Sequence, residues 1–113
     1  MAGATVDVAT TTDGTLIIQL HGTLDADDAV ELRATLVHAV RRLRPLRLVL
    51  DLHDVQALDA INVGTLAAAC QLGDDHGVAV FVEAASRKIA EKLTKAGVPR
   101  HRLREAPPLP LAS

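Results

Sequence analysis

The chain has 113 residues, which is enough for one domain with a single hydrophobic core and too few for a second. A net charge of -2 and a single aromatic residue, Phe81, exclude the strong basic field and the stacking platform typical of nucleic-acid binding. One cysteine excludes an internal disulfide, and the apolar runs are too short for a signal peptide or a membrane span. These features predict a cytoplasmic protein that does not insert into a membrane.

The first third of the chain predicts a β-hairpin followed by a helix. Residues 6–10 and the β-rich run 15–21 flank Asp13-Gly14, a pair typical of a tight turn, so two antiparallel strands are expected. The segment 22–25 is expected to end the second strand, and either Thr23 or Asp25 can cap the helix. The helix is expected to end in arginines before Pro45. Its buried stripe is predicted to be Ala29, Leu32, Leu36, Ala39, Val40 and Leu43.

The stretch 47–76 is the centre of the predicted fold. Residues 48–52 form a short apolar run with one carboxylate, which is typical of a strand buried on both faces. A loop is expected over residues 53–60. From Ile61 the apolar period changes to three and four residues, which predicts a helix ending at His76-Gly77. Such a strand, loop and helix place the start of the helix at the rim of a sheet, where binding sites are common. The inward residues of this helix are predicted to be Val63, Leu66, Ala67 and Cys70.

Two further elements complete the expected domain. Residues 78–82 are a second apolar run and predict an interior strand, parallel to the strand of residues 48–52 and reached by a right-handed crossover. Ser86 is expected to cap a third helix ending at Gly97, and residues 98–103 predict a short edge strand or a helical turn. The proline-rich residues 106–113 are expected to form a flexible tail after a domain of residues 1–105.

The joint before the central helix carries a family resemblance. The segment Leu58-Asp59-Ala60-Ile61-Asn62-Val63-Gly64-Thr65-Leu66 resembles the Asp-Ser-(Ser/Thr)-Gly-Leu-Gly signature of STAS domains. Asp59, Val63 and Gly64 match its Asp, Leu and second Gly. The other three positions differ: Ala60 replaces the phosphorylatable serine, Ile61 the next hydroxyl residue and Asn62 the first Gly. The order of elements from Val6 to about Leu103 resembles the family too. The resemblance implies an α/β fold, with a small mixed sheet and helices packed mainly on one face.

The resemblance also implies a function. Anti-sigma factor antagonists of this family are small cytoplasmic bacterial proteins of transcription regulation. They bind an anti-sigma kinase and are released when the serine after the Asp is phosphorylated. Because Ala60 has no hydroxyl, the resemblance implies a partner-binding protein with a degenerate phosphosite and without this switch. STAS domains also occur in lipid-export and anion transporters, so a cytoplasmic accessory subunit of a membrane transporter is the alternative. The expected partner-binding residues are Asp54, Val55, Ala57, Asp59, Ala60, Ile61, Asn62 and Thr65.

Neither catalysis nor a cofactor is predicted. Three acids near the end of the central strand suggest magnesium: Asp51, Asp54 and Asp59. A magnesium-dependent phosphoacceptor would also need an acidic pair from another strand end, where the sequence has only His21. The histidines lack ligand spacing within one element, and Ser86 is needed as a helix cap. The structural interpretation of Asp59 is that it caps the Ile61 helix.

The basic residues of the C-terminal third leave two interpretations open. They are accompanied over the same span by one acid, Glu91, and are Arg87, Lys88, Lys92, Lys95, Arg100, Arg102 and Arg104. One interpretation is a solvated face. The other is a docking surface for an acidic partner or a membrane headgroup layer, because clustered charge sets orientation and association rate. Self-association of the domain is also left open.

Overall fold

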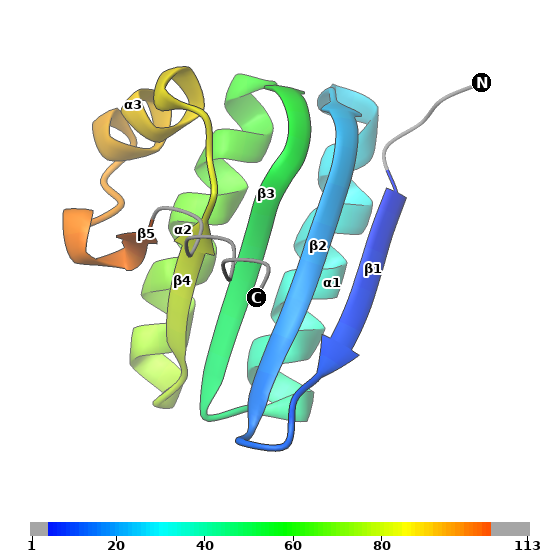
Figure 1. The fold of residues 1–113 in the computed structure, drawn as a ribbon, viewed down its shortest axis with the longest axis vertical. Coiled ribbons are helices and arrows are strands. Elements are labelled where there is room, and N and C mark those ends of the chain that lie inside the picture. Colours follow the sequence, from blue (N-terminus) through cyan, green and yellow to red (C-terminus); the bar gives the residue numbers. More distant parts are fainter. Residues whose placement is uncertain (1–4, 105–113) are drawn as a thin grey trace, which may run out of the picture.

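A five-stranded sheet carries helices α1 and α2 on one of its faces in the computed structural model, which describes residues 5–104 (Figure 1). The strands lie in chain order across the sheet, β1 to β5. β1 is antiparallel to β2, and the other neighbouring strands are parallel. The predicted mixed sheet with helices on one face is therefore confirmed. The strands are β1 (Thr5–Thr10), β2 (Thr15–Leu24), β3 (Arg47–Leu58), β4 (Ala79–Glu83) and β5 (Leu103–Arg104).

The helices begin at the caps that their sequences predict. Asp25 forms a capping box with Asp28, Asp59 accepts a hydrogen bond from the N–H of Ile61, and Ser86 accepts one from Ile89. None of the helices in residues 5–104 has the length and apolar character needed to cross a membrane. The helical segments are η1 (Ala26–Asp28), α1 (Ala29–His38), η2 (Ala39–Leu43), α2 (Ala60–His76), α3 (Arg87–Lys95) and η3 (Arg100–Arg102).

The predicted loop at residues 53–60 is wrong, because β3 continues to Leu58 and α2 begins at Ala60. β2 ends at Leu24, within the segment 22–25 that is expected to end it. The two strands stay paired across two register shifts, between Gln19 and His21 and between Gly22 and Thr23. Register shifts of this kind break the two-residue alternation of faces. The buried positions of β3 then recur every third residue, a pattern that does not look like a strand.

The core lies between the helices and one face of the sheet. Leu66 and Leu36 from the helices and Leu50 from β3 have at most 1% of their surface exposed. The predicted inward residues Val63 and Cys70 are buried. The prediction for Leu43 is wrong, because its side chain is 53% exposed. Residues 39–43 form a π-helical turn, with the N–H of Arg44 donating to the carbonyl of Ala39, and this wider turn rotates Leu43 outward.

The C-terminal third contains both a helical turn and a short edge strand, which the sequence left open as alternatives. The turn η3 leads into β5, which pairs in parallel with β4. Its arginines are partly neutralised, since Arg102 pairs with Asp74 at 2.5 Å and Arg104 pairs with Glu83. The side chain of Arg104 also lies over the ring of Phe81. The basic surface is therefore smaller than the sequence predicts. The expected tail of residues 106–113 lies outside the described residues.

Candidate protein-binding site

The junction between β3 and α2 holds the start of α2 at the rim of the sheet. The N–H of Asp59 donates to the carbonyl of Leu24, at the end of β2, with a distance of 2.9 Å. The carboxylate of Asp59 accepts from the N–H of Ile61, also at 2.9 Å. This bond confirms the predicted cap and satisfies one N–H that the first turn of a helix leaves free. The junction is consequently tied to the end of β2.

Two of the expected partner-binding residues are buried, which contradicts the expectation that they are exposed at the rim. Asn62 has 0% of its surface exposed, and its side-chain amide donates to the carbonyl of Asp25 at 2.7 Å. This bond joins the start of α2 to the corner between β2 and η1. Val55 is 7% exposed and belongs to the core, because the register shifts of β3 turn it inward. Both residues are therefore buried beneath the exposed residues at the rim and help to hold them in place.

The remaining apolar positions of the prediction form an exposed surface. Ile61 is 56% exposed, and Ala57, Asp59 and Ala60 are exposed around it. Gly64 lies one turn further along α2, and a Cβ added to it would meet no atom within 4 Å. It was absent from the predicted site, although its place in the STAS signature pointed to it. We call this set the rim surface: Ala57, Asp59, Ala60, Ile61, Gly64 and the half-buried Thr65.

A groove of about 500 Å³ leads away from the rim surface between α1 and α2. Ile61 and Thr65 line its end on α2, and Arg33, Val37 and Arg41 line it from the other side. The sequence could not show this groove, because it depends on how α1 and α2, which are separated in the chain by η2 and β3, pack together. Its position means that a partner covering Ile61 can also reach the arginines.

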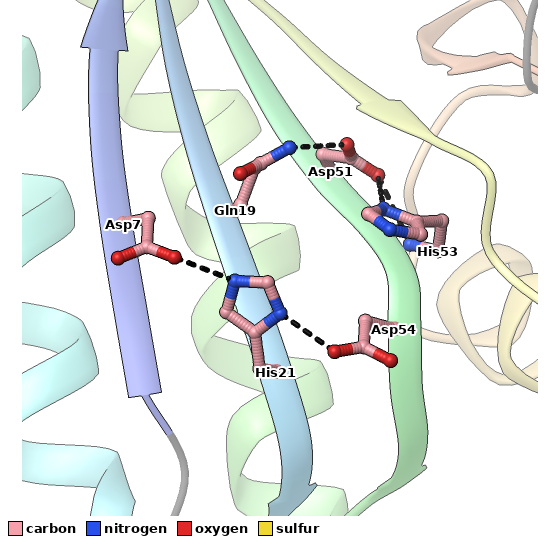
Figure 2. A network of polar contacts seen from close by, with 6 residues as sticks. All are labelled: Asp7, Gln19, His21, Asp51, His53 and Asp54. Atoms are coloured by element: carbon pink, nitrogen blue, oxygen red, sulfur yellow. Dashed lines mark hydrogen bonds and ion pairs between the residues drawn. The ribbon is translucent and has the colours of Figure 1, made fainter.

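Asp54 belongs to a different feature, a polar network on the face of the sheet that carries no helix (Figure 2). His21, on β2, contacts Asp54 of β3 through Nδ1 at 2.7 Å and Asp7 of β1 through Nε2 at 2.9 Å. A neutral imidazole has one N–H, so only the imidazolium ion donates to both carboxylates. In its protonated form the ring therefore links three strands. Asp54 is thus engaged within the domain, although its side chain remains 58% exposed.

Asp51 extends the polar network through contacts with His53 and Gln19. The carboxylate of Asp51 accepts from the backbone N–H of His53 at 3.0 Å and from the amide of Gln19 at 3.3 Å (Figure 2). Partial burial raises the pKa of Asp51, but these hydrogen bonds outweigh it, so the pKa lies below its ordinary value. The three acids considered for magnesium do not form one cluster. Asp59 caps α2, whereas Asp51 and Asp54 contact histidines. Within residues 5–104, no three His, Cys, Asp or Glu side chains are arranged to hold a metal.

The stability of the domain should depend on the proton of His21. The hydrogen bond to Asp54 raises the pKa of His21 above its ordinary value of 6.5, with Asp7 adding to the effect and partial burial opposing it. A raised folded-state pKa means stabilisation that is complete below 6.5 and is lost as the pH rises through the folded value. We therefore expect the melting temperature to fall across this window. His21→Gln should flatten that fall, whereas His101→Gln, an exposed control, should not. Identical pH profiles for wild type and His21→Gln would contradict this prediction.

Cys70 is a core residue. It is 3% exposed on the inner side of α2, and burial raises the pKa of its thiol to about 11. A thiol with this pKa carries almost no thiolate at neutral pH, and the thiolate is the reactive form. The side chain therefore contributes packing to the domain.

The fold and the rim surface define a class of protein: a small α/β domain with a capped helix start at the rim of a mixed sheet. The sequence matches the STAS domain over residues 8–103, and the chain belongs to the STAS domain family. No curated protein matches the chain in sequence.

Solved structures similar to this chain include both regulators and transporter domains. The phosphorylated form of the Bacillus cell fate determinant SpoIIAA has a TM-score of 0.76 at 15% identity, covering 92% of this chain and 93% of that chain. An anti-sigma factor antagonist from Mycobacterium paratuberculosis has a TM-score of 0.69 at 25% identity, covering 95% and 88%. A sulfate transporter family protein from Wolinella succinogenes has a TM-score of 0.68 at 18% identity, covering 85% and 80%. The same fold therefore occurs in both settings.

Proposed function

We propose that this protein is a non-enzymatic, cytoplasmic binding module of the anti-sigma factor antagonist type, and that it contacts its partner through the rim surface. The observation that carries the proposal is Ile61, which is 56% exposed at a rigidly capped helix start. Ala57, Ala60 and Gly64 surround it with small groups, so a partner can approach the backbone closely. Exposed apolar clusters of this kind usually mark an interaction site. The likeness to the Mycobacterium anti-sigma factor antagonist supports a partner of the serine kinase-like anti-sigma type.

The proposed binding is constitutive, without a serine phosphorylation switch. The residue after Asp59 is Ala60, followed by Ile61, and neither side chain has a hydroxyl. Thr65 has the nearest hydroxyl on α2, and it donates to the carbonyl of Ile61 at 3.0 Å. A kinase would have to extend a helical backbone to reach it. Phosphorylation therefore does not change the charge of the rim surface in the cell.

Mass spectrometry of the protein purified from its own host tests this point. No phosphate is expected on any residue of the stretch 54–66, Thr65 included. Ala60→Ser should restore an acceptor at the start of α2, where free N–H groups favour a phosphate and Asp59 repels it. Ala57→Ser, the same change in β3, is the matched control. Stoichiometric phosphate within this stretch of the wild-type protein would restore a switch and overturn constitutive binding.

A second candidate function is that of a cytoplasmic accessory subunit of a lipid or anion transporter. The likeness to the Wolinella sulfate transporter family protein favours it. Affinity capture from native cells separates the two functions. A kinase-like anti-sigma factor recovered by wild type and lost by Ile61→Asp supports the first, and a transporter ATPase with the same behaviour supports the second. A partner retained equally by Ile61→Asp would contradict the proposed surface.

A further inference from the structure

The outer edge of β1 is open to pairing with another strand (Figure 1). Within residues 5–104, β1 pairs only with β2, in a continuous register that contains no bulge. Proteins commonly protect an edge strand with a bulge, a proline or a lysine, and β1 reads Thr-Val-Asp-Val-Ala-Thr. Its only charge, Asp7, is bound by His21 at 2.9 Å. Among the described residues, the edge consequently offers unpaired peptide groups, and its one carboxylate already contacts His21.

Apolar side chains lie beside this edge on the helix-bearing face of the sheet. Val8 is 55% exposed and Leu43 is 53% exposed, and both line a hollow of about 330 Å³ between β1 and α1. Ala34, Thr35 and His38 line the same hollow from α1. The open edge and the apolar hollow therefore form one continuous surface, which β2 separates from β3 and the rim surface at its end.

We infer that a second copy of this chain occupies this surface, with β1 of one copy pairing antiparallel to β1 of the other. A two-fold axis perpendicular to the sheet joins the two sheets into one and keeps the helices of both copies on the same face. Val8 and Leu43 of one copy then meet the same apolar residues of the other. The pairing satisfies the outer peptide groups of both strands at once.

Charge complementarity between the two α1 helices supports a second copy over an unrelated strand. Thr35 and His38 of α1 line the hollow beside β1, and helical spacing places Glu31 one turn before Thr35 and Arg42 one turn after His38 on the same stripe. Both Glu31 and Arg42 are exposed, and neither forms an ion pair within residues 5–104. Val8 lies level with the middle of the stripe, because it shares the hollow with Thr35 and His38. A two-fold axis near Val8 makes α1 antiparallel to its copy, so Glu31 of each copy faces Arg42 of the other.

Analytical ultracentrifugation of the full chain, from low micromolar to millimolar concentration, tests the inference. The wild-type mass should rise with concentration from 11.9 kDa toward twice that value. Val8→Lys should weaken association at least about tenfold, because a lysine is a natural guard of edge strands. Leu43→Lys is the second variant, for the case that Val8→Lys disrupts β1 itself. Leu43 lies outside the sheet, and its substitution should weaken association to the same extent. Val30→Lys is the matched control, since Val30 is 81% exposed on α1 but does not line the hollow, and it should still dimerise.

A charge exchange tests the arrangement of the two helices. Glu31→Arg and Arg42→Glu should each weaken association roughly two- to tenfold, and the double variant should restore it. Wild type that remains monomeric at every concentration overturns the inference. A dimer that Val8→Lys and Leu43→Lys both leave intact, or a double variant that does not recover, overturns it as well.

Discussion

Replacing Leu66 by alanine is expected to lower the free energy of unfolding by about 2 to 5 kcal/mol. Leu66 has 0% of its surface exposed and belongs to the core between α2 and the sheet. The substitution removes buried methyl groups and leaves a cavity that the close-packed surroundings refill only in part. Since small domains have a total stability of about 5 to 15 kcal/mol, this loss is a large fraction of it. Urea unfolding of both proteins at one temperature measures the difference.

A leucine on the surface provides the control for this experiment. Leu46 is 75% exposed just before β3, and Leu46→Ala should change the free energy of unfolding by no more than about 0.5 kcal/mol. A loss below about 1 kcal/mol for Leu66→Ala would mean that the core tolerates the cavity and that α2 contributes less than its burial indicates.

Replacing Ile61 by aspartate is expected to weaken partner binding by about 2 kcal/mol or more, which is roughly a thirtyfold rise in Kd. The side chain is 56% exposed at the centre of the rim surface, so a partner that covers it would have to bury the new carboxylate. The fold should be retained, since the substituted position faces solvent. Isothermal titration with the captured partner measures the affinity, and circular dichroism checks the fold.

Leu46→Asp is the matched control for Ile61→Asp. Leu46 is also a large exposed apolar residue, but it precedes the start of β3, whereas the rim surface lies at the opposite end of that strand. Its substitution by aspartate should leave the affinity unchanged. Equal affinity of Ile61→Asp and wild type would move the interface away from the rim surface.

The sequence alone predicts most of the elements, because local chemistry determines them. Asp13-Gly14 marks the first hairpin, and Asp25, Asp59 and Ser86 mark the helix starts that the structure shows. Each of these signals involves residues within about four positions of one another, which is the range of a turn or a cap. Helical spacing likewise identifies the buried side of α2 correctly at Val63, Leu66 and Cys70. The resemblance to the STAS signature supplied the sheet type, which the structure confirms, and the place of the candidate site.

Only the tertiary structure decides which residues of the candidate site are exposed. Val55 turns inward because the pairing of β2 and β3 shifts register twice. The apolar pattern of one strand does not show how that strand is aligned with its neighbour. Asn62 can be buried because its side-chain amide donates a hydrogen bond to the carbonyl of Asp25, 37 positions earlier. His21 acquires two carboxylates from positions 14 and 33 residues away. Contacts at such separations follow from the packing of elements, which local sequence patterns do not encode. The caps and the helix faces are therefore properties of the sequence, whereas the rim surface, the groove and the charged histidine exist only once the strands have paired.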